Sequence, residues 1–128
     1  MTGARVLILD DDIDLLDLMG DVIFRFCGRP VLKVASLRDL IMQKTSAFGC
    51  GVAFIDINLG PDCPSGIEAY QWLRSNKFCG HLSFLTAHAH THPLVRKARE
   101  LDNVSVLEKP IDVDRLIRTV EEGSRDHR

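Results

Sequence analysis

The apolar residues of this chain gather in five short runs, and the stretches between the runs have helical spacing. The runs are rich in Val, Ile, Leu and Phe and lie at residues 6–9, 31–35, 52–55, 82–85 and 104–107. Strands that are apolar throughout and alternate with helices are typical of a parallel sheet covered on both faces. We therefore predict an α/β fold, a doubly wound five-stranded parallel sheet with five helices.

Each intervening stretch has signals for where its helix begins and ends. The first helix is predicted to end before Gly28, the second to begin at Ser36 with Asp39 three residues on, and the fourth to begin at Pro93. Asp112 is placed to cap the last helix. Two core stripes are predicted from the spacing, one in the first helix and one in the last: Leu15, Leu18, Met19, Val22, Ile23 and Phe26; and Val113, Leu116, Ile117 and Val120.

Polar residues follow four of the apolar runs, at the point where each strand should end. They are Asp10 and Asp11, then Asp56, then Thr86 and Ala87, then Lys109 and Pro110. The carboxyl ends of neighbouring parallel strands open into one crevice, so we expect these side chains to meet there. Three carboxylates, a hydroxyl and an ammonium group suit the binding of a divalent metal and a phosphoryl group.

Length and composition favour a single domain. The 128 residues fit one core, predicted to span about residues 4–122 with a short polar C-terminal tail. The 16 basic and 18 acidic residues nearly balance, which argues against binding to nucleic acid or to an anionic membrane. No apolar run approaches the roughly 18 residues that span a bilayer, and no signal peptide precedes the first run, so we expect a cytoplasmic protein.

The strand-end residues, in this order and spacing, resemble the signature of response-regulator receiver domains of two-component signalling. The resemblance covers essentially the whole chain and implies a flavodoxin-like fold, as in single-domain, chemotaxis-type regulators. It implies that Asp56 is the phosphoacceptor. It also implies a Mg²⁺ or Mn²⁺ ion held by Asp10, Asp11, Asp56 and the backbone carbonyl of Asn58.

The same resemblance implies how the site works. Asp56 would attack the phosphorus of a phosphohistidine, with Lys109 and Thr86 contacting the phosphoryl oxygens and the small Ala87 leaving room for a backbone N–H. A cis peptide bond is common at the position of Lys109 and Pro110. The chain would then catalyse only its own phosphorylation and dephosphorylation. Its partners would be a histidine kinase or histidine phosphotransfer protein and a downstream protein, with no direct contact to nucleic acid or membrane, and the chain itself would be a monomer or weak homodimer.

Two positions depart from the family pattern. Val106 stands where receivers usually carry Tyr or Phe, which puts an aromatic rotamer switch in doubt. Gly66 lies about two residues further from Asp56 than in the commonest receivers. We expect any coupling to use smaller movements of Thr86 and of the segment that follows it.

Several other interpretations of the same residues remain open at this stage. Asp12 and Asp14 are most simply a helix cap and a first-turn residue, and the alternating His88, His90 and His92 are more simply a solvated loop than a metal site. The chain is either a whole protein or the excised receiver of a larger regulator or hybrid kinase. Alternative functions are a haloacid-dehalogenase-like phosphatase with Asp10 as nucleophile, and a binding module that works without phosphorylation.

Overall fold

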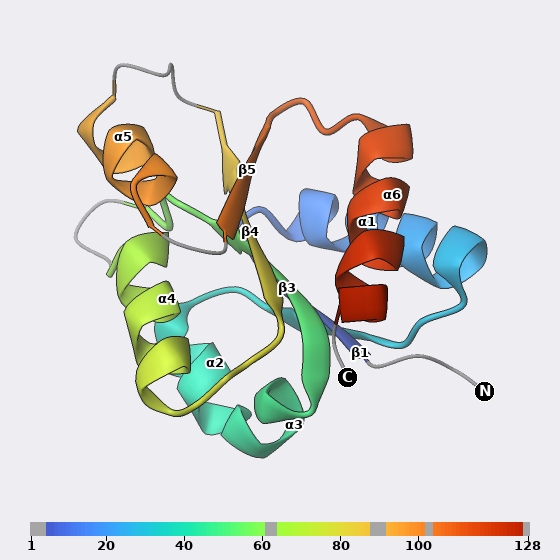
Figure 1. Ribbon diagram of the computed structural model, residues 1–128, viewed down its shortest axis with the longest axis horizontal. Coiled ribbons are helices and arrows are strands. Elements are labelled where there is room, and N and C mark those ends of the chain that lie inside the picture. The colour runs from blue at the N-terminus through green and yellow to red at the C-terminus, as the bar shows by residue number, and fades with distance from the viewer. Residues whose placement is uncertain (1–4, 61–63, 88–91, 102–103, 127–128) are drawn as a thin grey trace.

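Five parallel strands form one sheet in the order β2-β1-β3-β4-β5 (Figure 1). The computed structural model describes residues 5–60, 64–87, 92–101 and 104–126. The strands, each close to its predicted position, are β1 (Arg5–Leu9), β2 (Val31–Val34), β3 (Cys50–Asp56), β4 (His81–Thr86) and β5 (Val104–Glu108). The prediction of a doubly wound parallel sheet is confirmed.

The described residues form six helices, one more than expected. They are α1 (Ile13–Cys27), α2 (Leu37–Met42), α3 (Lys44–Phe48), α4 (Gly66–Ser75), α5 (Pro93–Arg99) and α6 (Val113–Asp126). The additional helix arises because the predicted second helix divides at Gln43, whose backbone leaves the helical conformation at φ −108° and ψ 29°. Within the described residues, none of the helices is long and apolar enough to cross a membrane.

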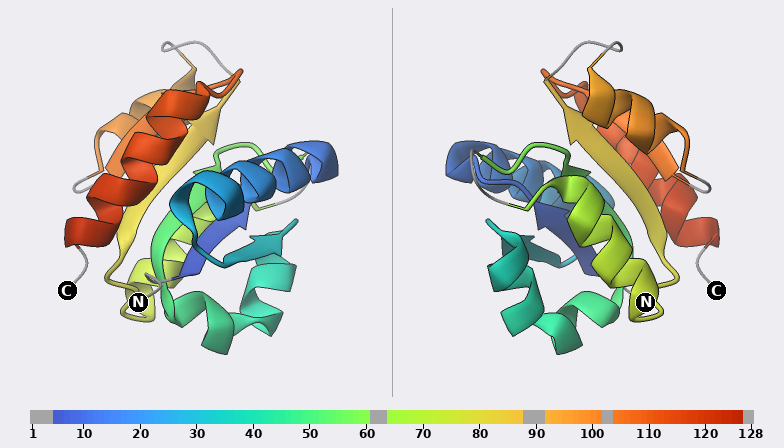
Figure 2. Two further views of the ribbon diagram at one scale, coloured as in Figure 1. Left: turned by 90° about the vertical axis from the view of Figure 1, so that its right-hand side faces the viewer. Right: turned by 90° about the vertical axis from the view of Figure 1, so that its left-hand side faces the viewer.

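The helices cover the two faces of the sheet as two separate layers (Figure 2). Successive residues of a strand point to opposite faces, so each strand supplies both cores. On one face, Ile8 of β1 and Phe54 of β3 pack with α1 and α6. On the other, Leu7 and Ile55 pack with α2, α3, α4 and α5.

The helix signals predicted at Asp12, Ser36 and Asp112 act as caps in the structure, and Ser65, which was not predicted, caps α4 in the same way. The side chains of Asp12, Ser36 and Ser65 accept hydrogen bonds from the backbone N–H groups three residues on, at the starts of α1, α2 and α4. Gly28 ends α1 in the left-handed conformation, with φ 67°. Asp112 accepts hydrogen bonds from the N–H groups of Asp114 and Arg115 at the start of α6.

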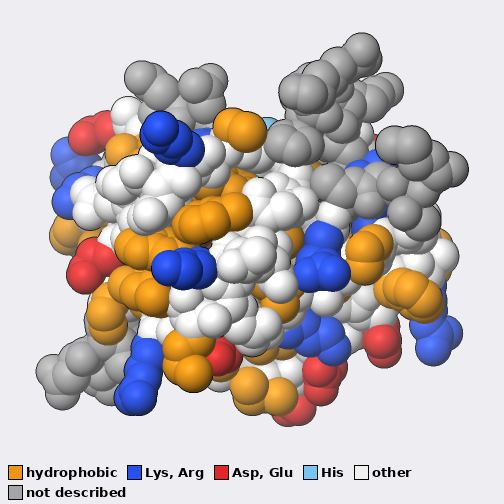
Figure 3. Space-filling model, turned by 90° about the horizontal axis from the view of Figure 1, so that it is seen from below, with side chains coloured by type: hydrophobic (Ala, Val, Ile, Leu, Met, Phe, Trp, Pro, Cys, Tyr) orange, Lys and Arg blue, Asp and Glu red, His pale blue; other side chains and the backbone are white. Residues whose placement is uncertain are grey.

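The predicted core stripes of α1 and α6 are partly wrong. Leu18 is 60% exposed, Phe26 is 65% exposed and Val113 is 44% exposed, whereas Leu16 is buried on the sheet. Met19 and Ile23 of the stripe predicted for α1 do face the sheet, together with Leu16. Leu15, Leu18 and Val22 instead line a groove toward α6. Figure 3 shows one face of the surface, on which groups of hydrophobic side chains lie between basic and acidic ones.

Candidate functional site

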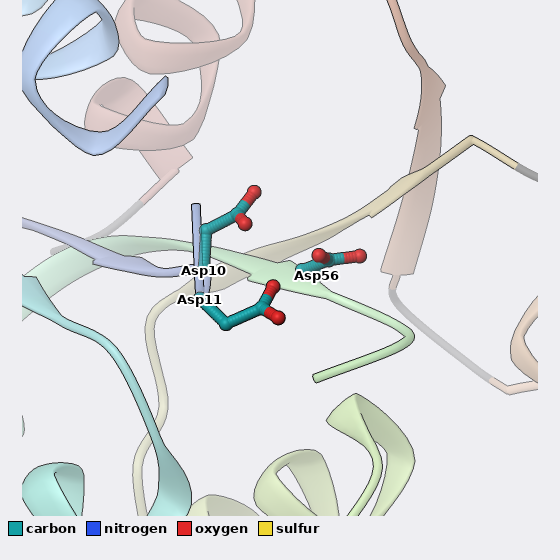
Figure 4. A group of neighbouring side chains, drawn as sticks. All are labelled: Asp10, Asp11 and Asp56. Atoms are coloured by element: carbon teal, nitrogen blue, oxygen red, sulfur yellow. The ribbon is translucent and has the colours of Figure 1, made fainter. Parts of the chain in front are cut away.

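The acidic residues meet where the strand order reverses, between β1 and β3. At such a switch point the loops diverge to opposite faces of the sheet and leave a crevice at the carboxyl ends of the strands. Asp10 and Asp11 follow β1, Asp56 ends β3, and one carboxylate oxygen of each lies within 4.8 Å of the others (Figure 4). Asp10 and Asp56 are buried, whereas Asp11 is exposed at the mouth.

Lys109 joins this acidic group from the segment after β5. Its Nζ lies 2.9 Å from Asp10 Oδ2 and donates a 3.2 Å hydrogen bond to Asp56 Oδ2. Its backbone N–H donates to the carbonyl of Thr86 at 2.8 Å, so the same residue also binds the end of β4. The expected cis peptide bond between Lys109 and Pro110 is confirmed.

The segment after Asp56 folds back on itself through short hydrogen bonds. Asp56 Oδ1 accepts from the N–H of Asn58 at 3.2 Å, and Asn58 Oδ1 accepts from the N–H of Gly60 at 3.1 Å. The N–H of Gly66, the first residue of α4, donates to the carbonyl of Ile57 at 2.7 Å. The phosphoacceptor candidate is therefore held by both its strand and the start of the next helix.

The buried charges perturb each other. Burial and the neighbouring Asp10 charge raise the pKa of Asp56 to about 7, although Lys109 acts in the opposite direction. Burial lowers the pKa of Lys109, but its contacts with Asp10 and Asp56 more than offset this and raise the pKa above its ordinary value. Lys109 is thus a permanent cation beside a carboxyl group that titrates near neutral pH.

The oxygen atoms at the site fit a small divalent cation. Asp10 Oδ1 accepts from the N–H of Asp12, and the buried Asp10 Oδ2 forms the 2.9 Å ion pair with Lys109 Nζ. A buried carboxylate of Asp10 beside oxygens of Asp11 and Asp56 is the hard ligand set that Mg²⁺ prefers. Asn58 follows two residues later, where its backbone carbonyl would complete such a set.

The remaining predicted residues lie around this group. Thr86, almost fully buried, ends β4 beside Asp56, because Leu85 of that strand pairs with Asp56 in the sheet. Ala87 follows and is exposed. Val106 is buried in the core on the α4 and α5 side.

The simpler interpretations of the flanking residues fit the structure. Asp12 caps α1 and Asp14 lies in its first turn, as expected. His92 caps α5 through Nδ1, which accepts from the N–H of Leu94 at 3.2 Å. His88 and His90 lie outside the described residues.

Two features next to the site were missed by the sequence analysis. One is a groove of about 270 Å³ between α1 and α6, whose lining includes Leu15, Leu18, Ile111, Val113 and also Lys109. The other is the close approach of Gly66 to the backbone of Asp56. The sequence signal for the groove was the number of apolar residues in α1, which exceeds what one face of a helix can bury. Nothing in the sequence near Gly66 indicates its close approach to Asp56.

Comparisons with known proteins identify the family of the chain. Residues 6–121 match the family model described as the response regulator receiver domain. A search of curated proteins gives no match.

Solved structures with the same fold cover nearly the whole chain. The signal receiver domain of a putative LuxO repressor protein from Vibrio parahaemolyticus is 25% identical, with a TM-score of 0.82 over 98% of this chain and 92% of that one. A response regulator receiver protein from Sinorhizobium medicae is 21% identical, with a TM-score of 0.81 over 98% of each chain. A CheY-like receiver domain protein from Methanospirillum hungatei is 21% identical, with a TM-score of 0.77 over 97% and 95%. With its acidic crevice at the switch point and a family match over most of its length, the chain belongs to the response regulator receiver domains.

Proposed function

We propose that this chain is a phosphorylation-dependent switch of a two-component system that accepts a phosphoryl group on Asp56. The observation that carries the proposal is the position of Asp56: its carboxylate lies at the end of β3, beside Asp10 and Asp11 and 3.2 Å from Lys109 Nζ. The switch would comprise one domain, with a core at about residues 4–122, and would act in the cytoplasm. Receivers are not generally enzymes with an external substrate, and here we propose only self-phosphorylation and self-dephosphorylation.

A Mg²⁺ or Mn²⁺ ion at the site would be held by Asp10, Asp11, Asp56 and the carbonyl of Asn58. The carboxylate oxygens of Asp10, Asp11 and Asp56, which lie within 4.8 Å of one another, support this assignment. When bound, the ion supplies positive charge that offsets the clustered carboxylates against an incoming phosphoryl anion.

The reaction is an attack by one carboxylate oxygen of Asp56 on phosphorus. A new O–P bond forms, the N–P bond of a phosphohistidine breaks, and the imidazole leaves with the bonding pair and then takes up a proton. Lys109, already within 3.2 Å of Asp56, is placed to balance charge on the phosphoryl oxygens. The hydroxyl of Thr86 and the backbone N–H of Ala87 would donate the remaining hydrogen bonds.

The phosphodonor would dock across the groove between α1 and α6. The groove shares Lys109 with the acidic site, and Leu18 and Val113 on its walls are exposed. A helix of a histidine kinase or phosphotransfer protein, with apolar residues on one face, matches this surface and would bring its phosphohistidine over Asp56. Downstream, the phosphorylated chain would bind a target protein, as a monomer or weak homodimer and without contacting nucleic acid or membrane directly.

Coupling from the site would run through the end of β4. Thr86 is joined to Lys109 by the 2.8 Å backbone hydrogen bond, and Val106 fills the neighbouring core in place of an aromatic ring. Movement of Thr86 toward a phosphoryl group would therefore shift the packing of β4, β5 and α5 by small displacements.

Intact mass after incubation with acetyl phosphate tests the proposal. Wild type should gain one phosphoryl group in Mg²⁺ and none in EDTA, and Asp56→Asn should gain none. Asp10→Asn should react more slowly because it loses a metal ligand. A label on Asp10 would favour the phosphatase alternative, and no gain in any sample would favour a phosphorylation-independent binding module.

A further inference from the structure

We propose that Gly66 is a positioning residue for the phosphoacceptor. Because it has no side chain, the start of α4 rests directly on the backbone of Asp56 and holds the Asp56 carboxylate and the Asn58 carbonyl in place. The inference rests on the proposed function of Asp56 and adds a residue of another element to the machinery.

The space around Gly66 admits no side chain. A Cβ atom there would overlap the carbonyl oxygen of Asp56 and lie 2.8 Å from its carbonyl carbon and 2.9 Å from Ile57 Cα. These are backbone atoms, so they cannot swing aside as the end of a long side chain does. Among the described glycines only Gly28 and Gly60 have positive φ, so the requirement at Gly66 is one of space and not of backbone conformation.

The helix start is also fixed from several sides. The N–H of Gly66 donates to the carbonyl of Ile57 at 2.7 Å. Ser65 and Glu68 form a reciprocal capping box. Ile67 and Ala69, which follow, are buried in the core. A larger residue 66 would therefore press against the Asp56 peptide, because these contacts hold α4 in place. The N–H of that peptide donates to the carbonyl of Leu85 at 3.0 Å, so the pressure also acts on the pairing of β3 with β4.

Displacement of that peptide acts directly on the site. The peptide between Asp56 and Ile57 is bonded to the Cα that carries the nucleophilic carboxylate, and the N–H of Asn58 donates to that carboxylate. A shift of the peptide turns the carboxylate away from Lys109 and moves the Asn58 carbonyl with it. Misplacement by about 1 Å is enough to slow a positioned reaction about 100-fold.

The test compares Gly66→Ala with Gly123→Ala. Gly123 of α6 is a matched control because a Cβ there is also crowded, at 2.9 Å from His81 Cβ. That contact is with a side chain and does not involve the backbone of Asp56. We expect Gly66→Ala to slow phosphorylation by acetyl phosphate at saturating Mg²⁺ about 10- to 100-fold. It should also raise the calorimetric dissociation constant for Mg²⁺ about 10-fold. Gly123→Ala should leave both values unchanged.

The outcomes separate this inference from the proposed function. If wild type is not phosphorylated, the proposed function fails and this inference fails with it. If wild type is phosphorylated and Gly66→Ala matches it in both rate and Mg²⁺ affinity, the positioning role alone is wrong. Equal losses in Gly66→Ala and Gly123→Ala would also overturn it, because they would indicate general destabilisation.

A second pair of variants covers the case in which Gly66→Ala does not fold. Ser65→Ala keeps the glycine but removes the cap that holds α4 against Asp56, whereas Ser36→Ala removes the equivalent cap of α2. We expect Ser65→Ala to slow phosphorylation about fivefold and Ser36→Ala to leave the rate unchanged. Equal rates in the two variants would contradict the inference.

Discussion

The carboxylate of Asp56 opposes folding at neutral pH. Its pKa in the folded chain is about 7 against an ordinary value of 3.8, because burial and Asp10 disfavour the charged form. Between these two pH values the unfolded chain loses the proton that the folded chain keeps, so stability falls as pH rises through this range and is constant above it. The carboxylate that we propose as the phosphoacceptor therefore weakens the fold at neutral pH.

Asp56→Asn should accordingly stabilise the protein at pH 8. The variant removes a buried carboxylate that repels Asp10, and we expect its free energy of unfolding to rise by about 1–2 kcal/mol after allowance for solvent screening. At pH 4 the gain should be much smaller, because Asp56 is then protonated in the folded chain and partly protonated in the unfolded one. Urea denaturation at both pH values measures this, with the exposed Asp14→Asn as control. A less stable Asp56→Asn at pH 8 would contradict the assignment.

Metal affinity should follow the same titration. Protons and Mg²⁺ compete for the Asp56 carboxylate, so the Mg²⁺ dissociation constant should rise about 10-fold between pH 8 and pH 6. Isothermal calorimetry at fixed ionic strength measures the change. In Asp56→Asn the same pH change should have little effect, and an equal pH dependence in that variant would assign the proton to another group.

Helix α1 shows what sequence periodicity can and cannot decide. Its length, its Asp12 cap and its end at Gly28 follow from local chemistry and are confirmed. The rotation of the helix about its axis cannot be predicted from local chemistry. The helix carries apolar residues on more than one side, and only packing on the sheet decides which side is buried. Leu16 takes the buried position, and Leu18 is left to line the groove beside Lys109.

This rotation predicts a loss specific to protein donors. Leu18→Ser should slow phosphotransfer from a protein phosphodonor about 10-fold and leave phosphorylation by acetyl phosphate unchanged, because the small donor needs no docking surface. Phe24→Ser is the matched control, since Phe24 is 66% exposed on the same helix and does not line the groove. Both rates can be measured by stopping the reactions at set times and determining the phosphorylated fraction of the protein by intact mass. Equal slowing with the two donors would exclude a docking role.

Some features of the site could be predicted from the sequence and others could not. The strand-end positions of Asp10, Asp56, Thr86 and Lys109 could be predicted because apolar runs end visibly in the sequence. The contact of Gly66 with Asp56 could not, since it depends on two backbones ten residues apart meeting in space. The division of the second helix at Gln43 also depends on local backbone geometry that no strong breaker in the sequence marks.

The acidic crevice is formed by residues from several strands of the domain. A ligand that binds there should therefore stabilise the whole fold. Mg²⁺ that binds only the folded chain, at 100 times its dissociation constant, should raise the free energy of unfolding by about 2.7 kcal/mol. Urea denaturation with Mg²⁺, compared with Na⁺ at the same ionic strength, separates binding from general screening. Asp10→Asn should lose most of the increment, and a full increment in that variant would place the ion elsewhere.

The acidic crevice is assembled from β1, β3, β4 and the segment after β5, which span the chain from Asp10 to Lys109. No half of the sequence contains it. A partly synthesised, truncated or misfolded copy therefore lacks the acceptor geometry even though it contains Asp56 itself. Acceptance of a phosphoryl group on Asp56 would thus also report that a molecule is intact, so that damaged copies would compete poorly for the donor and contribute no false signal.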